Sequence, residues 1–419
     1  MDSFIYALQR ICAVMATILS VMYFYQVLYL FVPLVIRKKK PEGPVRQHRF
    51  AILIAARNEE AVLPHLLDTI RNQDYPADLI TTYVIADNCT DKTALVASQH
   101  GAHVYERFNK KQVGKGYALD YLLERIEADG HLKDYDAFMI FDADNLLSPG
   151  YFTAMNKTVA EGYEAFSGYR NTKNFATSWL SAGYGIWYLH DSVHMNQSRY
   201  LLGSTCAVNG TGFGFTQGLL QKMGGWKFFT LTEDIEFSVL SACRGYKVGY
   251  CHDAVLYDEQ PDKWKPSYRQ RVRWSQGGMQ VVMRHSGELF KGMLHAKTFY
   301  PSFEAMTLTM WGLTIGAVTG ILGAILAFCT QGTGGGFLTL LIALGTTYLS
   351  MAGVAALTVL TEWKRIHATT ARKLYSILCF PIFMITWLPI SALSVFHKPV
   401  WTPIEHTVAI SADQLSKKK

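Results

Sequence analysis

Three long stretches without a charged residue constrain the fold of this chain more than any other feature. They run from Ile11 to Ile36, from Ala305 to Thr361 and from Leu374 to Phe396. About 20 apolar residues suffice for one helix to cross a bilayer. A buried core helix is the alternative, but a globular helix of such length normally carries a polar face. We therefore predict membrane segments at 5–36, 303–361 and 374–396.

Two of these segments contain residues that interrupt a helix. The middle segment is too long for one crossing, and the glycine-rich sequence 330–336 divides it, so 303–361 is expected to form two transmembrane helices. Pro381 and Pro389 lie inside the last segment, which favours a kinked or re-entrant element at 374–396 over a simple crossing.

Basic residues beside these segments predict the orientation of the chain. Arg37 and three lysines follow the first segment, which we interpret as a retained anchor, and positive charge marks the cytoplasmic end of a crossing. The region after the anchor is then cytosolic, and the protein is a multi-pass protein of the plasma membrane. The basic tail at 397–419 stays cytosolic if the last segment is re-entrant. The net charge of +7 suits lipid head groups and a nucleotide diphosphate, and no nucleic-acid partner is predicted.

The region between the first two segments alternates apolar strands with amphipathic helices. Residues 50–56 are expected to form a buried strand, two further strands end at Asp87 and Asp144, and helices are expected at 59–72 and 116–129. This alternation is typical of an α/β domain with a parallel sheet covered by helices on both faces. Ligands bind at the carboxyl ends of the strands in such sheets, which places the acidic residues at a site.

Several polar motifs follow these strands. Asp142 and Asp144 form an Asp-x-Asp pair whose oxygens suit Mg²⁺ or Mn²⁺. Asp234 follows Glu233 in "LTEDIEF", and 35 residues separate it from Gln270 in "QRVRW". A helix over 266–279 would place Gln270, Arg273 and Trp274 on one face. Each motif also has a plain structural interpretation, as a turn, a helix cap or an interfacial helix.

Together the motifs resemble the "D, D, D35, QxxRW" signature of the family 2 glycosyltransferases, which include the cellulose, hyaluronan and poly-N-acetylglucosamine synthases. The resemblance covers about residues 50–280 and implies a GT-A (Rossmann-like) domain at 45–280 with a cytosolic active site. It assigns catalysis to Asp234 as the base, with Glu233 beside it in the catalytic set, and metal binding to Asp142 and Asp144. The implied nucleotide-sugar contacts are Ala55, Arg57, Glu59, Asp87, Lys115, Asp142, Gln270 and Arg273. The implied acceptor contacts are Trp274, Gly210, Thr211 and Gly212.

The resemblance implies an inverting transfer from a UDP-sugar to a growing β-linked polysaccharide. "NGTGFGF" at 209–215 departs from the cellulose synthase form "FFCGS", so the polymer stays open. Transfer of one sugar to a membrane lipid is the first alternative, and a non-catalytic transport or scaffold subunit is the second. The expected partners are the UDP-sugar, a polysaccharide or lipid acceptor and membrane lipids, with an accessory subunit as a further candidate.

Overall fold

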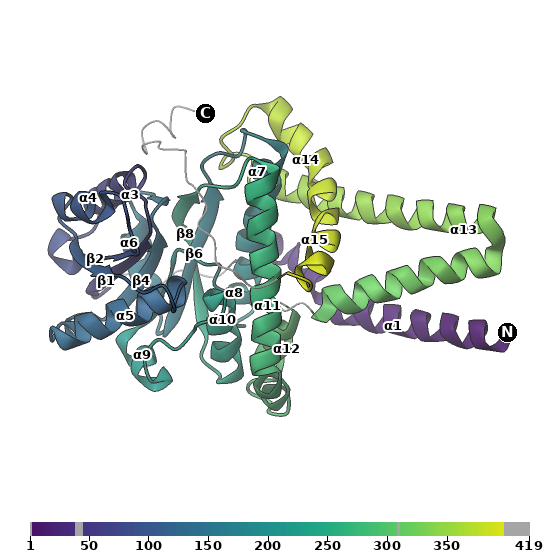
Figure 1. Ribbon diagram of the computed structural model, residues 1–419, viewed down its shortest axis with the longest axis horizontal. Helices are drawn as coiled ribbons and strands as arrows, with labels where there is room; N and C mark the ends of the chain where they lie inside the picture. Colours follow the sequence, from purple (N-terminus) through teal and green to yellow (C-terminus); the bar gives the residue numbers. More distant parts are fainter. Residues whose placement is uncertain (1, 38–44, 308–310, 398–419) are drawn as a thin grey trace.

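The computed structural model describes residues 2–37, 45–307 and 311–397. A mixed α/β domain occupies one end of the molecule, and long helices project from one side of it (Figure 1). The predicted tail at 397–419 lies almost wholly outside the described residues, as do the three lysines after Arg37.

The domain is built on a single eight-stranded sheet with the order β3-β2-β1-β4-β7-β6-β8-β5. The strands are β1 (Phe50–Ala56), β2 (Ile80–Asp87), β3 (His103–Arg107), β4 (Ala137–Asp142), β5 (Leu146–Leu147), β6 (Ala165–Thr172), β7 (Phe213–Thr216) and β8 (Val248–Asp258). The predicted strand at 50–56 is confirmed at both ends, and the predicted strand end at Asp87 is confirmed.

The sheet corrects the expectation of an all-parallel arrangement. Strands β3, β2, β1 and β4 are parallel, but β7 runs antiparallel to both β4 and β6. The chain between β6 and β7 contains helical residues 179–201 and then the glycine-containing loop at 209–212, from which β7 enters the sheet in the reverse direction. Strand β4 also ends at Asp142, so Asp144 lies in the following turn.

Helices cover both faces of the sheet, as the sequence predicts. One face packs its apolar side chains against α3 (Leu63–Arg71), α4 (Thr93–Gln99) and α6 (Tyr151–Ala160). The other packs against α5 (Lys115–Ala128), α7 (Trp179–His190), α9 (Gln217–Met223) and α10 (Glu233–Cys243). Helix α7 continues through a π-helical turn, Asp191–Asn196, into α8 (Gln197–Leu201). The two layers hold the sheet rigid, which fixes the strand ends that carry the acidic residues.

Helix α11 (Trp264–Met293) is much longer than the predicted helix at 266–279. The predicted domain limit at residue 280 therefore falls inside a helix. It is followed by α12 (Phe299–Thr307), and both pack against α10. The extra length of α11 was hard to predict because Gly277, Gly278 and Gly287 lie within it, and glycine has low helix propensity.

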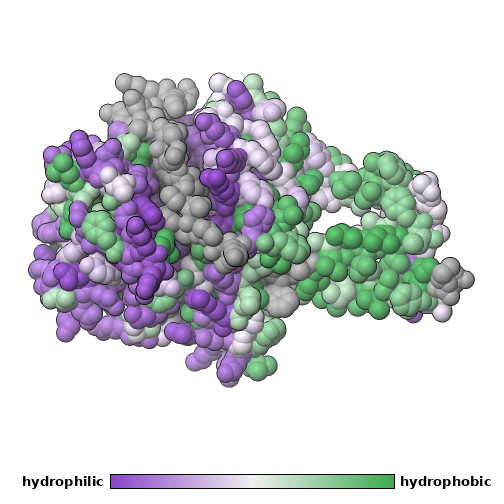
Figure 2. Space-filling view, in the orientation of Figure 1, coloured by the Kyte–Doolittle hydropathy of each residue, from purple (hydrophilic) through white to green (hydrophobic). Residues whose placement is uncertain are grey.

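Three helical segments of the described chain are long and apolar enough to cross a membrane, namely Ser3–Val35, Ile315–Thr361 and Thr370–Ser394. The first comprises α1 (Asp2–Tyr29) and α2 (Val32–Val35). The second belongs to α13 (Trp311–Thr361), which reverses direction at Gly332, where φ is 68°. Hydrophobic residues gather on the projecting helices, whereas the surface of the domain is mostly hydrophilic (Figure 2).

The last apolar segment differs from the other two in its packing. It forms α14 (Thr370–Ile385) and α15 (Trp387–Ser394), which run beside the domain and across the direction of α1 and α13 (Figure 1). Its most apolar stretch is 39% buried, compared with 0% in the first segment and 6% in the second. Gly183 of α7 lies so close to Phe383 that an added Cβ would be 2.5 Å from that ring.

Candidate active site

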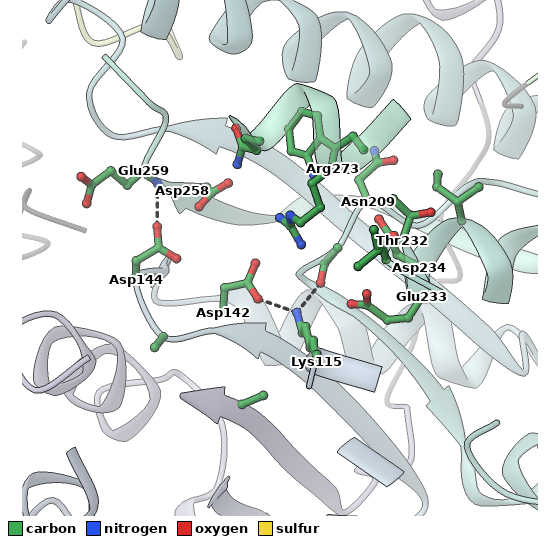
Figure 3. A pocket seen from close by; sticks show the side chains of 18 of the residues that line it. Lys115, Asp142, Asp144, Asn209, Thr232, Glu233, Asp234, Asp258, Glu259 and Arg273 are labelled. Carbon is green, nitrogen blue, oxygen red and sulfur yellow. Dashed lines mark hydrogen bonds and ion pairs between the residues drawn. The ribbon is translucent and has the colours of Figure 1, made fainter. Parts of the chain in front are cut away.

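The predicted site residues converge on one cavity of about 420 Å³ between the strand ends and helices α10 and α11. Figure 3 shows Lys115 between Asp142 and the Glu233–Asp234 pair, with Arg273 above them and Asp144, Asp258 and Glu259 to one side. The predicted residues that line this cavity are Ala55, Arg57, Glu59, Asp87, Lys115, Asp142, Asp144, Gly210, Glu233, Asp234, Gln270, Arg273 and Trp274.

Lys115 is the central cation of the cavity. It opens α5, and its Nζ donates to Asp142 Oδ1 at 2.5 Å and to the Gly210 carbonyl at 2.6 Å. Burial lowers the pKa of Lys115, but the charges of Asp142 and Glu233 outweigh it and hold that pKa above its usual value. Gly116 lets the helix start close to the neighbouring loop, because an added Cβ would lie 2.0 Å from the Phe228 carbonyl oxygen.

Asp87 ends β2 with a buried partner that the sequence motif did not reveal. Arg107, at the end of the adjacent strand β3, donates from Nη1 to Asp87 Oδ1 at 2.6 Å. Asn88 donates to the same oxygen, and its backbone is left-handed, with φ of 53°. These contacts fix the Asp87 carboxylate at the edge of the cavity. Both Arg107 and Asn88 bond to Oδ1, and neither bonds to Oδ2.

The acidic residues around Asp144 fit a divalent cation that is shared with a ligand. Asp142 and Asp144 both line the cavity, and the Glu259 amide orients Asp144 by donating to Oδ2 at 3.0 Å. Within the described residues, no group of three acidic, histidine or cysteine side chains is close enough to hold a metal alone. Mg²⁺ commonly takes one or two carboxylates and completes its shell with water and phosphate oxygens, so two aspartates suffice.

Asp258 and Arg170 form a buried ion pair on the same wall of the cavity. Arg170 donates from Nε to Asp258 Oδ2 at 2.9 Å, and its guanidinium lies 3.8 Å above the Tyr188 ring. Burial raises the pKa of Asp258 to about 7, with Arg170 acting in the opposite direction and the charge of Asp144 adding to the rise. Negative charge is thus crowded here, which a bound cation would relieve.

Glu233 and Asp234 begin helix α10 and face the cavity together. Burial raises the pKa of Glu233 to about 7, and the neighbouring Asp234 charge adds to the rise while Lys115 opposes it. Burial also raises the pKa of Asp234. A hydrogen bond from the Ile235 amide and the positive charges of Lys115 and Arg170 oppose this rise. A carboxylate with a raised pKa is a better proton acceptor near neutral pH than an exposed one.

Helix α11 holds these acids in place. Gly277 is so close to Thr232 that an added Cβ would lie 2.5 Å from its Oγ1 and 2.8 Å from its amide nitrogen. Gln280 Oε1 accepts from the Leu231 amide at 2.9 Å, and His285 contacts Glu236 at 2.9 Å. The 35 residues between Asp234 and Gln270 are therefore the length of chain that brings α11 back to the start of α10.

The predicted face of the "QRVRW" sequence points into the cavity. Gln270, Arg273 and Trp274 all line it from α11. Gln270 Oε1 and Arg273 Nε are buried and have no hydrogen-bond partner in the described structure. Buried polar groups are normally paired, so these atoms are suited to an oxygen-rich ligand.

The glycine-containing loop at 209–212 is only partly exposed to the cavity. Asn209 and Gly210 line it, whereas Thr211 and Gly212 lie behind its wall. Thr211 Oγ1 accepts from the Asp142 amide at 3.0 Å, and a Cβ on Gly212 would lie 1.8 Å from Leu256. Thr211 and Gly212 therefore brace the loop, and their contact with an acceptor stays a prediction.

Sequence reasoning missed several residues of the cavity, namely Arg170, Trp187, Tyr188, Asn209, Asp258, Glu259 and Trp387. Asp258 carried a usable signal, because it ends an apolar strand as Asp87 and Asp142 do. Trp387 carried none, since it lies in an apolar segment that we assigned to the membrane.

The family described as "Glycosyltransferase like family 2" matches residues 48–277, more than half of the chain. The chain is a family 2 glycosyltransferase. This confirms the family indicated by the sequence motifs and excludes neither acceptor class.

Two bacterial relatives each match more than half of the chain. "Probable glycosyltransferase YdaM" of Bacillus subtilis is 26% identical over 58% of this chain and 58% of its own length. "Beta-monoglucosyldiacylglycerol synthase" of Synechocystis is 25% identical over 55% of this chain and 47% of its own length. The glycosyltransferase thus spans about half the length of the curated relatives it matches.

Polymer synthases and a solved structure also resemble the glycosyltransferase. "Poly-beta-1,6-N-acetyl-D-glucosamine synthase" of Staphylococcus epidermidis is 24% identical over 67% of this chain and 63% of its own length. A mannosyltransferase from Pyrobaculum calidifontis, solved with GDP-Man and Mn²⁺, matches with a TM-score of 0.54 and 17% identity, over 93% of this chain and 99% of its own. That likeness shows a shared GT-A fold, which confirms the predicted fold class.

Proposed function

We propose that the glycosyltransferase transfers a sugar from a UDP-sugar to a growing β-linked polysaccharide at the cytosolic face of a membrane. The observation that carries this proposal is the joint placement of Asp142, Asp144, Asp234 and Arg273 around one cavity. Acidic metal ligands, a buried acid with a raised pKa and a cation are the groups that a nucleotide-sugar transfer requires.

The donor would occupy the strand-end side of the cavity. Asp87 and Arg57 would contact the uridine, and Arg273 and Lys115 the diphosphate. Asp142 and Asp144 would hold Mg²⁺ or Mn²⁺, which supplies charge neutralisation for the leaving diphosphate. The mannosyltransferase that shares the fold was solved with Mn²⁺, which agrees with this metal assignment.

Asp234 would act as the base. Its carboxylate accepts the proton of the acceptor hydroxyl, whose oxygen forms the new bond to the anomeric carbon as the bond to UDP breaks. One displacement inverts that carbon and gives the β-linkage. Glu233 would hold a proton for part of the time near neutral pH, because burial and the Asp234 charge raise its pKa to about 7.

The acceptor would lie against the aromatic wall of the cavity. Trp187 and Trp274 line it, and their ring centroids are 5.8 Å apart. Such flat apolar faces suit the C–H face of a sugar ring, which supports a saccharide as acceptor.

Product length tests this proposal. We expect purified protein with Mn²⁺ to release UDP from one member of a panel of radiolabelled UDP-sugars and to give a long water-soluble product. Label found only in an organic-soluble product of one added sugar would contradict polymerisation. Absence of UDP release with every donor would contradict the transfer itself.

Transfer of one sugar to a membrane lipid is the second candidate. It is favoured by the small membrane part of the described chain, since the apolar stretches of α1 and α13 are almost wholly exposed and bury little against other helices. The relative that makes a glucosyldiacylglycerol agrees with it. Stimulation of UDP release by diacylglycerol vesicles would favour a lipid acceptor. Stimulation by an added oligosaccharide would favour a polysaccharide acceptor.

The membrane arrangement is also a proposal. We infer that α1 and the two halves of α13 cross the plasma membrane, while α14 and α15 lie against the cytosolic domain without crossing. Both ends of this last element contact the domain: Tyr169 donates to Glu362 at 2.6 Å just before it, and Gln276 donates to the Ser394 carbonyl at 3.2 Å at its end.

Protease protection in sealed inside-out vesicles tests this arrangement. A tag after Lys419 should be digested, because the tail would stay on the cytosolic side. A tag inserted at Gly334, in the turn of α13, should be protected and serves as the matched control. Protection of both tags would show that the last element crosses.

A further inference from the structure

The wall of the cavity opposite the strand ends includes a residue from the last apolar element. Trp387, the first residue of α15, lines the cavity together with Trp187 and Trp274. Its ring stacks on Trp274 with centroids 6.1 Å apart and planes 16° apart, and it meets Trp187 edge-on at 5.0 Å. Three tryptophans from α7, α11 and α15 thus form one surface, which we call the tryptophan wall.

The indole nitrogen of Trp387 is a hydrogen-bond donor without a partner. It is buried and makes no hydrogen bond in the described structure, although the ring itself is only half-buried. A buried tryptophan N–H normally finds an acceptor. A sugar hydroxyl at the tryptophan wall would supply one, while the ring faces supply the apolar contact.

Polar side chains of α11 hold α15 in place. Arg271 donates from Nη1 to Thr386 Oγ1 at 2.6 Å, directly before Trp387. Ser275 contacts Ser391 at 3.1 Å, and Gln276 donates to the Ser394 carbonyl. Helix α11 therefore presents Gln270, Arg273 and Trp274 to the cavity and uses the residues between and after them to bind α15.

Arg271 is placed to fix the ring of Trp387 as well as the backbone before it. The side chain is fully buried, and its guanidinium lies 5.7 Å from the Trp387 ring centroid and 5.0 Å from that of Phe383. A planar cation between aromatic rings restricts their tilt, which a lysine ammonium does less well. Within the described residues, no ion pair of Arg271 with an acidic side chain is found.

We propose that Trp387 contacts the acceptor sugar as the third member of the tryptophan wall, and that Arg271 positions it through Thr386. Arg271 is a positioning residue, since it does not line the cavity. The proposal rests on the proposed glycosyl transfer and adds that the last apolar element is part of the active site. Loss of this wall should weaken acceptor binding and leave the nucleotide side intact.

Partition of the donor between transfer and hydrolysis tests this proposal. The full chain in detergent, with Mn²⁺ and the UDP-sugar that gives wild-type UDP release, is assayed for total UDP and for sugar incorporated into product. Trp387→Ala should lower incorporation per UDP released about tenfold, the effect of losing one aromatic contact and one hydrogen bond. Trp387→Phe should retain part of the incorporation per UDP released. The Kd for UDP should change less than twofold in both variants.

The positioning role has its own pair of variants. Thr386→Val keeps the shape of the side chain but removes the acceptor of the Arg271 bond, whereas Thr386→Ser keeps the hydroxyl. We expect Thr386→Val to lower the ratio of incorporation to UDP release several-fold, and Thr386→Ser to keep the wild-type ratio. Trp363→Ala is the matched control, because Trp363 is half-buried against the core and does not line the cavity.

The outcomes separate this proposal from the proposed function. If wild-type protein releases no UDP, the proposed transfer fails. If wild type is active and Trp387→Ala and Trp387→Phe both keep the wild-type ratio, the acceptor role of Trp387 is overturned. Equal loss of UDP binding and incorporation in Trp387→Phe would also overturn it, since that pattern reports a structural effect. Equal ratios in Thr386→Val and Thr386→Ser would overturn the role of Arg271.

Discussion

The two halves of the active site are built in different ways. The proposed nucleotide side rests on four parallel strands that follow one another within about a quarter of the chain, and Arg57, Asp87 and Asp142 stand at or just after their ends. The proposed acceptor side combines a loop before β7, the starts of α10 and α15 and the middle of α11. One half is determined by local sequence, whereas the other depends on contacts between distant segments.

This difference explains what the sequence could predict. Asp87 and Asp142 were found because an apolar strand followed by an acid is a local pattern. Trp387 was not found, because its place at the cavity depends on the packing of α14 on α7 and of α15 on α11, between residues about 110 to 200 positions apart. A motif likewise gives the residues of a loop but not which of them face a cavity, and Thr211 and Gly212 do not line it.

The largest expected effect concerns the base. Asp234→Asn should lower transfer about 10³-fold, because a positioned proton acceptor contributes roughly 10²- to 10⁴-fold. The Kd for UDP should stay near the wild-type value, since Asp234 lies on the proposed acceptor side of the active site. UDP release and UDP binding measured on the same protein provide the check. A mild loss of activity would mean that Asp234 serves only as a first-turn acid of α10.

The next effect distinguishes the two sides through the metal. Asp144→Asn should lower transfer about 10²-fold and raise the Mn²⁺ concentration needed for half-maximal rate, because one of two charged ligands is lost. Asp78→Asn is the control, since it removes one exposed carboxylate outside the cavity. Titration of activity with Mn²⁺ gives the answer, and an unchanged half-maximal concentration in Asp144→Asn would argue against this ligand.

A smaller effect tests the contact that joins α10 to α11. Gly277→Ala places a methyl group within 2.5 Å of Thr232, so the start of α10 must shift. Overpacking of this kind costs about 1–3 kcal/mol, and we expect roughly a tenfold loss of transfer with a lower Tm. Gly287→Ala, on the same helix with open space around it, should keep wild-type activity. Equal behaviour of the two variants would show that the α10–α11 contact does not set the catalytic geometry.

The smallest effect is the pH dependence, and it again separates the two sides. The pKa of Glu233 is raised to about 7, so at lower pH the pair with Asp234 holds a proton and the base is less available. Transfer should therefore rise as pH increases from about 6 to 8. Glu233→Gln removes the neighbouring charge, which should let Asp234 ionise at lower pH and move this rise downward. UDP binding should show no such shift, because the nucleotide side is fixed by the Asp87–Arg107 pair rather than by the acids of α10. The transfer rates of wild-type protein and Glu233→Gln, measured between pH 5 and 9, provide the check. A rise in transfer rate near pH 7 that persists in Glu233→Gln would assign the titration to a different group.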